Sequence, residues 1–272
     1  MPHSLSTHET SPLLFLNPRA TDAPQKPTPF QRFKRHLANE ITSNGADLIL
    51  LFCYIITGLL DSSAVFIWGS FASMQTGNTV YLGLGLSGLD ESGKSQRWLK
   101  ALISISSFCI GSSFFAALSR VFRSSRERGA LVLSFILQMG CIAAAAGIVS
   151  FTPQPQDKAD RIGWRNGAPL ALVAFQSAGQ AVTSRVVGFN GLTSVVLTSV
   201  YCDLFSSLGG SGHGKRADEW RRLGAVGGLM LGILLGGVWA KSEVGSVGAL
   251  WTAMVLKAGI AVAWFCWKGE TD

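Results

Sequence analysis

DLILLFCYIITGLLDSSAVFIWGSFASMQTGNTVYLGLGLS, residues 47–87, is the stretch that decides the fold. After Asp47 at its start, Asp61 is the only residue in it with a charged side chain. A helix crosses the hydrocarbon core of a bilayer with about 20 apolar residues, so this run of 41 residues is long enough for two crossings. The stretch therefore predicts an integral membrane protein.

The rest of the chain is similarly apolar. Hydrophobic residues make up 48% of the 272 residues and charged residues only 14%, whereas a soluble domain carries about 25% charged residues. Inside a bilayer every backbone polar group must be hydrogen-bonded within the protein, so each apolar run is predicted to be a helix. The prediction is an all-α, polytopic integral membrane helical bundle with eight apolar segments. They span residues 47–68, 70–88, 98–119, 130–151, 167–187, 191–208, 223–240 and 247–267.

The N-terminal region differs from the rest. Residues 1–46 contain six prolines among polar residues, which predicts a disordered tail, and residues 47–268 form the predicted transmembrane domain. Arg32, Lys34 and Arg35 lie just before the first apolar segment, so the tail is expected in the cytoplasm. The net charge of +7 comes from basic residues in the connections between segments. That distribution is typical of cytoplasmic loops and not of a nucleic-acid-binding surface.

Two topologies remain open. Eight crossings with a cytoplasmic N-terminus place 16 Lys and Arg inside and five outside, but leave the four arginines of residues 120–129 on the outer side. Six crossings, with segments 70–88 and 191–208 re-entrant, place 14 inside and seven outside. Both agree with the excess of positive charge expected in the cytoplasm. We favour eight crossings because each hairpin is long enough to cross twice.

The two halves of the chain resemble each other at an offset of 122 residues. The offset predicts a duplication, with repeat one at 47–151 and repeat two at 167–267, parallel for eight crossings and inverted for six. Transporters often contain such repeats and bind their substrate where the repeats meet. The matching positions are Thr76 and Thr198, Leu82 and Leu204, Leu86 and Leu208, Gly88 and Gly210, and Trp98 and Trp220.

One apolar segment carries a glycine at every fourth position. The helix face that these glycines form is nearly bare backbone, so another helix can approach it closely. Packing inside the bundle is the preferred interpretation, and a contact within a homo-oligomer is the alternative. The glycines are Gly224, Gly228, Gly232 and Gly236.

Four charged residues interrupt the apolar segments. Each is unfavourable in the middle of a bilayer, so a partner or a watery cavity is expected. Asp61 and Arg185 occupy nearly equivalent places in the two repeats, and we expect them to pair. The set predicts a site that binds solute or protons, or else a purely structural network. The charged residues are Asp61, Arg185, Asp203 and Lys257, and the polar residues expected around them are Thr76, Asn78, Gln176 and Gln180.

The polar residues of the first half form a pattern. Gly58-Leu-Leu-Asp61, Phe71 and the box Met74-Gln-Thr-Gly-Asn78-Thr79 resemble the signature of the YoaK-like membrane proteins, the family of domain of unknown function 1275 (DUF1275). Gln75 is an insertion relative to that signature. The resemblance covers about residues 47–268. It implies a polytopic membrane protein and no particular function, since the family has none assigned. In the second half the resembling residues are Gln176, Arg185, Thr193 and Thr198, with Ser199 where glycine is usual.

The sequence lacks the patterns of an enzyme or a cofactor site. There is no Gly-x-Ser-x-Gly, no Walker box and no histidine-rich metal motif. The five cysteines fall inside apolar segments without Cys-x-x-Cys spacing, and the four histidines lie in the tail or in a loop, so no metal or cofactor is expected. A carboxylate pair of Asp61 and Asp203 is the remaining enzymatic alternative. We expect a small-solute or ion transporter; the alternative is a membrane scaffold or sensor with purely structural charges.

A short motif in the tail predicts an address. Glu9 lies four positions before the pair Leu13 and Leu14, which is the acidic dileucine form that sorting adaptors bind. In a eukaryotic host this motif predicts residence in a vacuolar, lysosomal or endosomal membrane, with an adaptor as partner of the tail.

Overall fold

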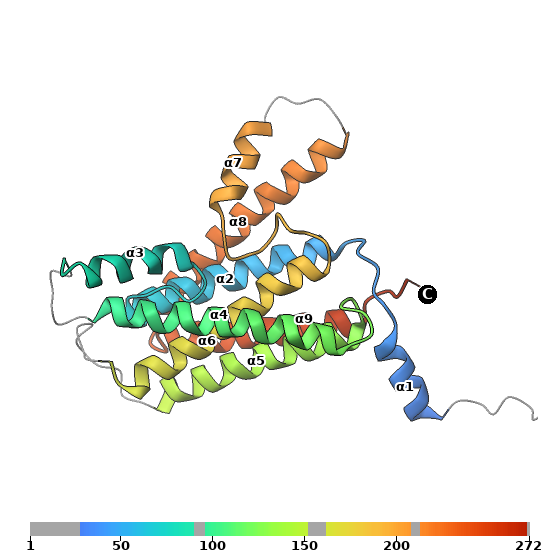
Figure 1. Cartoon of the computed structure of the whole chain (residues 1–272), viewed down its shortest axis with the longest axis horizontal. Helices are drawn as coiled ribbons and strands as arrows, with labels where there is room; N and C mark the ends of the chain where they lie inside the picture. The colour runs from blue at the N-terminus through green and yellow to red at the C-terminus, as the bar shows by residue number, and fades with distance from the viewer. Residues whose placement is uncertain (1–27, 90–95, 152–161, 208–212, 271–272) are drawn as a thin grey trace, which may run out of the picture.

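The computed structural model describes residues 28–89, 96–151, 162–207 and 213–270. These residues form α-helices and no β-strand, as predicted (Figure 1). Five helices are long and apolar enough to cross a membrane: α2, α4, α5, α9 and the part Arg216–Lys241 of α8. The fold thus fits an integral membrane protein. The helices are α1 (Pro29–Ala38), α2 (Ala46–Trp68), α3 (Gln75–Leu86), α4 (Arg97–Val121), α5 (Arg128–Phe151), α6 (Trp164–Val186), α7 (Thr198–Ser207), α8 (His213–Lys241) and α9 (Ser246–Phe265).

The long helices form one bundle. α2 packs mainly against α8, α4 against α6, and α5 against both α9 and α6. At one end of the bundle residues 39–45 meet the connection 122–127 and the C-terminal residues 266–270. We call this end the terminal end. α7 and the first part of α8 project away from the other helices (Figure 1).

Two of the eight predicted segments differ from the prediction. α3 has 12 residues and α7 has 10. At 1.5 Å per residue they extend about 18 and 15 Å, well short of the roughly 30 Å of a hydrocarbon core. Residues 70–74 and 191–197 are irregular backbone that leads into these short helices. The prediction of eight full crossings is therefore not confirmed.

α6 has the length of a crossing but is too polar to be counted with the five. Gln176, Ser177, Gln180 and Thr183 lower its hydropathy, and all four are buried. A helix that is polar and yet buried lies among other helices rather than against lipid. α6 is accordingly packed against α4 and α5.

The predicted packing glycines lie along α2. An added Cβ on Gly228 would lie 3.3 Å from the carbonyl oxygen of Leu51, and one on Gly232 would overlap the carbonyl oxygen of Ile55. Gly224 and Gly236 also face side chains of α2. The bare face of α8 therefore allows the close approach of α2 inside the same chain.

The predicted tail contains a helix. Pro29 was expected to interrupt helical structure, but it stands at the start of α1, where its fixed φ fits and its missing N–H is not needed. Thr28 and Gln31 form a capping box around this start. The disorder predicted for residues 1–27, and the sorting motif with them, lies outside the described residues.

Candidate functional site

Asp61 fastens irregular backbone to α2. Its Oδ1 accepts hydrogen bonds from the backbone N–H groups of Ala72 at 2.9 Å and Ser73 at 2.8 Å. Its Oδ2 accepts one from the Ser73 hydroxyl at 2.5 Å. Hydrogen bonds to a charged acceptor are stronger than neutral ones. Asp61 therefore provides acceptors for the N–H groups of Ala72 and Ser73, which lie outside any helix or strand.

Asn78 completes this structure from the first turn of α3. Its Oδ1 accepts from the Ser70 hydroxyl at 2.8 Å and from the Phe71 N–H at 3.0 Å. Its Nδ2 donates to the Phe71 carbonyl at 2.8 Å and to the Ser104 hydroxyl at 3.0 Å. Gln75 Nε2 donates to the Ala72 carbonyl at 2.9 Å and to Ser104 at 3.2 Å. We call Asp61, Ser73, Gln75, Asn78 and Ser104 the loop cluster.

A second polar group connects α6 to α2. Gln180 Nε2 donates to Thr57 Oγ1 at 2.9 Å, to Ser194 Oγ at 2.8 Å and to the Cys53 carbonyl at 3.2 Å. Ser194 lies in the irregular connection between α6 and α7. It is fully buried with a φ of 59°, a conformation that is uncommon for a residue other than glycine. The Oε1 atom of Gln180 is buried without a hydrogen-bond partner among the described residues.

Lys257 lies fully buried in α9. Its Nζ donates to Gln138 Oε1 at 2.5 Å and lies 4.8 Å from the centroid of the Phe135 ring. Gln138 Nε2 in turn donates to the Ser134 hydroxyl at 3.1 Å. Within the described ranges no carboxylate forms an ion pair with Lys257. The ammonium group is therefore surrounded by neutral partners.

The lysine site and the Gln180 site are neighbours. An added Cβ on Gly179 would lie 2.7 Å from the Gln138 side chain, so the glycine leaves room for that amide. We call Thr57, Gln138, Gln180, Ser194 and Lys257 the central cluster. Gln176, one turn before Gln180, donates to its own helix and to Ser177, and its buried Oε1 also has no described partner.

The predicted pair of Asp61 and Arg185 is not formed. Arg185 is exposed near the end of α6 and donates to the Ala181 carbonyl of its own helix at 2.8 Å. Both oxygens of Asp61 already accept hydrogen bonds from the loop, which is why the carboxylate needs no cation. The sequence showed the charge of Asp61 but not the irregular backbone beside it.

The other predicted residues are divided between the surface and the clusters. Thr76 is exposed on α3. Asp203 is exposed on α7, 4.0 Å from Arg222, whose Nη1 also donates to the Asp203 carbonyl at 3.1 Å. Because Asp61 bonds to residues 72 and 73 and Asp203 to α8, the structure does not bring the two carboxylates together.

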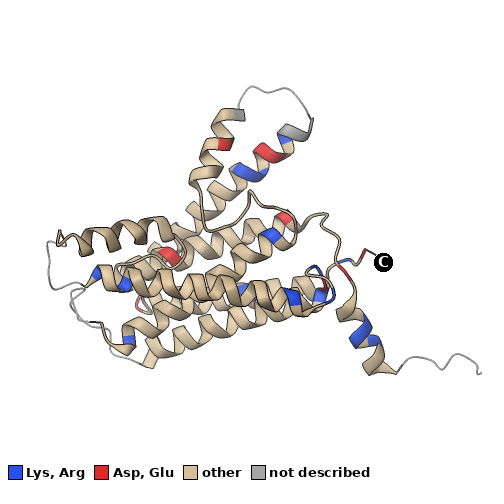
Figure 2. Cartoon of the chain, in the orientation of Figure 1, with Lys and Arg blue, Asp and Glu red and all other residues tan. Residues whose placement is uncertain are grey.

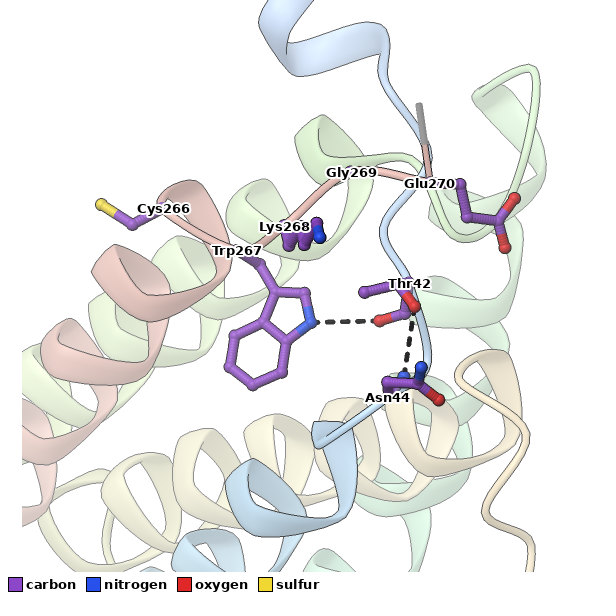
Figure 3. A pocket seen from close by; sticks show the side chains of 7 residues that line it. All are labelled: Thr42, Asn44, Cys266, Trp267, Lys268, Gly269 and Glu270. Carbon is purple, nitrogen blue, oxygen red and sulfur yellow. Dashed lines mark hydrogen bonds between the residues drawn. The ribbon is translucent and has the colours of Figure 1, made fainter. Parts of the chain in front are cut away.

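A cavity at the terminal end was missed by the sequence analysis. It has a volume of about 550 Å³ and is open to the outside. Figure 3 shows Trp267 Nε1 donating to the Thr42 carbonyl at 3.0 Å across one side of it. None of its lining residues was a predicted site residue. They are Thr42, Asn44, Cys266, Trp267, Lys268, Gly269 and Glu270.

Two arginines build the terminal end. Arg128 is fully buried and donates to the carbonyls of His36 and Trp267, each at 2.6 Å. Arg126 forms ion pairs with Glu40 at 3.6 Å and Glu270 at 3.5 Å. The sequence analysis counted both as loop charges, because hydropathy gives no sign that distant segments meet there. Figure 2 shows that Lys and Arg gather near the ends of the long helices and on α1.

Comparisons with known proteins identify a family. The family model described as Protein of unknown function (DUF1275) matches residues 49–263. No curated protein and no solved structure matches the chain. The match covers both the loop cluster and the central cluster. Asp61 and Asn78, which belong to the family signature, are the residues that hydrogen-bond the irregular backbone before α3.

Proposed function

The chain belongs to the family described as protein of unknown function DUF1275, and from that premise we propose that it is a small-solute or ion transporter whose polar centre is the central cluster. The observation that carries the proposal is Lys257, fully buried and bonded to the neutral amide of Gln138. A charge buried without an opposite charge costs several kcal/mol. An apolar side chain at position 257 would stabilise the bundle more than a lysine does, so we infer that the lysine serves a purpose other than stability.

The neighbourhood of Lys257 also supports a binding role. The buried Oε1 atoms of Gln176 and Gln180 accept no hydrogen bond from the described residues. Buried polar atoms without partners are unfavourable, and each requires a reason. A transported solute, a proton or water that enters between α5, α6 and α9 would provide partners for these atoms and for the ammonium group.

The packing of the helices supports two inverted repeats. Each half has the order long, short, long, long: α2 to α5, then α6 to α9. The first helix of each half packs on the third helix of the other, α2 on α8 and α6 on α4, and the fourth helices pack together. Phe135 and Lys257, which are in contact, are separated by the same 122-residue offset. Inverted repeats are a common architecture of transporters, with the site at their interface.

This arrangement leads us to propose six crossings, with α6 as the sixth and with α3 and α7 re-entrant. Both chain ends and the connection 122–127 then lie in the cytoplasm. A cysteine introduced at Arg123, in a variant without the five native cysteines, should resist an impermeant thiol reagent added to intact cells. Ser43→Cys, which is cytoplasmic in both topologies, is the control. Labelling at position 123 alone would favour eight crossings.

The transport proposal is tested by comparing the small-solute contents of cells that lack the protein with those of cells that express it. Expression should change the content of at least one solute or ion, and Lys257→Met should abolish that change. Lys241→Met, the same substitution at an exposed position, should behave as the wild type. If no solute content changes, or if Lys257→Met is as effective as the wild type, the proposal fails.

A membrane scaffold or sensor is the second candidate. The observation in its favour is the loop cluster, where the carboxylate of Asp61 is satisfied by the loop itself and therefore has a structural role. For a scaffold, Lys257→Met would leave all effects of the protein in cells unchanged. The same substitution thus separates the two candidates.

A further inference from the structure

α1 has an apolar face and a basic face. Phe30, Phe33 and Leu37 follow the spacing i, i+3, i+7 and lie on one side of the helix. Arg32 and Arg35 project from the other side. With Lys34 they give the helix three positive side chains at positions that are all exposed, and α1 contains no acidic residue. Such a helix fits a surface with an apolar layer, which its phenylalanines would contact, next to a negatively charged layer, which its basic side chains would contact.

α1 contacts the bundle from Phe33 to its C-terminal end. The rings of Phe33 and His36 lie 6.2 and 4.9 Å from the ring of Phe265, the last residue of α9. Leu37 lies beside Gly129 at the start of α5. The apolar face is therefore turned toward the ends of the membrane-spanning helices.

The N-terminal half of the same face is largely uncovered. Phe30 is 75% exposed, and Phe33 is still 50% exposed beside Phe265. α1 has 10 residues, and a helix shorter than about 12 residues is marginal in water without a partner. A neighbour that covers Phe30 would stabilise this half.

The position of α1 shows what that neighbour is. α1 runs across the direction of the long helices at the terminal end and not along it (Figure 1). If α5 and α9 cross the bilayer, their ends mark the boundary between hydrocarbon and headgroups. Phe33, which packs on Phe265 at the end of α9, then lies at this boundary, and Phe30 follows one turn along the same face of α1. Arg32 and Arg35 lie on the opposite side of the helix. This is the placement of an amphipathic interfacial helix.

We propose that α1 lies in the membrane interface, with Phe30 and Phe33 at the acyl boundary and with Arg32, Lys34 and Arg35 bound to anionic lipid headgroups. The occupant of the exposed face is thus the bilayer that the chain itself spans. The proposal rests on the membrane fold and does not depend on transport.

The test is amide hydrogen exchange of residues 29–38 in the full chain, reconstituted in nanodiscs of phosphatidylcholine alone or of phosphatidylcholine mixed with phosphatidylserine. Exchange should be slower with phosphatidylserine, and high salt should reduce the difference. Each Lys or Arg near an anionic surface contributes roughly a fivefold factor to binding. Arg32→Gln with Arg35→Gln should therefore remove about 25-fold of the protection.

The matched control is Arg120→Gln with Arg123→Gln, which removes two exposed arginines from the same end of the bundle. It should leave the protection of α1 unchanged. A Phe30→Ser variant should lose protection in both lipids while the long helices exchange as in the wild type. Equal protection in the two lipids would overturn the proposal, as would equal losses in the two arginine variants; either result would mean that the lipid charge does not act on α1.

Discussion

Asp61 and Lys257, two charged residues within the apolar helices, are in opposite situations. Asp61 accepts three hydrogen bonds, two of them from backbone N–H groups, and both its oxygens have partners. Lys257 is bonded to one neutral amide and faces an aromatic ring. The carboxylate replaces hydrogen bonds that an interrupted helix lacks. Lys257 does not replace any missing backbone hydrogen bond, because α9 is a continuous helix around it.

This difference separates structure from function. A charge whose hydrogen bonds are satisfied by its own backbone belongs to the fold, and its removal should damage the fold. A buried charge without a counter-charge weakens the fold, and its presence needs a reason outside stability. The predictions below test this distinction.

The largest effect is expected for Asp61→Ala. The substitution leaves the N–H groups of Ala72 and Ser73 and the Ser73 hydroxyl without their acceptor. Unsatisfied buried groups cost about 1–3 kcal/mol each, so the loss of three partners should lower the free energy of unfolding by about 3–9 kcal/mol. Thermal unfolding of the purified protein in detergent measures the loss. Asp203→Ala, at an exposed carboxylate of α7, is the control and should unfold as the wild type does. An unchanged melting temperature for Asp61→Ala would mean that Asp61 does not stabilise the fold.

Lys257→Met should have the opposite sign. Replacing a buried charge with an apolar side chain of similar volume is often neutral or stabilises a protein by about 1–4 kcal/mol. We expect the variant to unfold at the same or a higher temperature and to lose its effect on cellular solutes. A strong destabilisation would instead make Lys257 a structural residue like Asp61.

Gly232→Ala tests the packing of α8 on α2, the helix that contributes Asp61 and Thr57 to the two clusters. Its new Cβ would overlap the carbonyl oxygen of Ile55 on α2. Overpacking of this kind costs about 1–3 kcal/mol, which thermal unfolding should detect. Gly227, on the same helix, has no atom within 4 Å of an added Cβ. Gly227→Ala should therefore leave stability unchanged or slightly raised, and equal effects of the two substitutions would contradict the packing described here.

The smallest effect is expected for Arg185→Gln. The side chain is exposed and, among the described residues, bonds to the Ala181 carbonyl of its own helix. Surface substitutions usually change stability by less than about 0.5 kcal/mol. If Asp61 and Arg185 did form a pair in the bilayer, the double variant Asp61→Asn, Arg185→Gln would be more stable than Asp61→Asn alone. We expect the two to have equal melting temperatures.

Much of the fold was predictable, because hydropathy reports burial in lipid directly. The runs at 47–68, 98–119, 130–151, 223–240 and 247–267 all became long helices. The short helices were not predictable in this way. An apolar run with an internal break has the same hydropathy as two crossings, and the break is stabilised by Asp61 and Asn78 through contacts that only the fold reveals.

The sequence pointed to four residues of the two clusters but not to their partners, and three other predicted residues, Thr76, Arg185 and Asp203, are exposed. Asp61, Asn78, Gln180 and Lys257 all lie in clusters, since an intramembrane polar group needs contacts wherever it is. Which groups meet depends on helix rotation and on close approaches such as that at Gly179. Charge complementarity alone suggested Arg185 as the partner of Asp61, whereas the nearest donors are neutral N–H groups of the adjacent loop.

The junction at the terminal end has a consequence for the order of biosynthesis. Ile41 bridges to Gly269, and Glu40 bridges to Glu127. A ribosome adds about 5–20 residues per second, so residue 269 follows residue 41 after about 10–45 s. Arg126 and Arg128 are made earlier than the C-terminal residues, and for about 7–28 s they lack their C-terminal partners. The junction can close only after the last helix has entered the bilayer, and its closure therefore reports that the chain has been fully inserted.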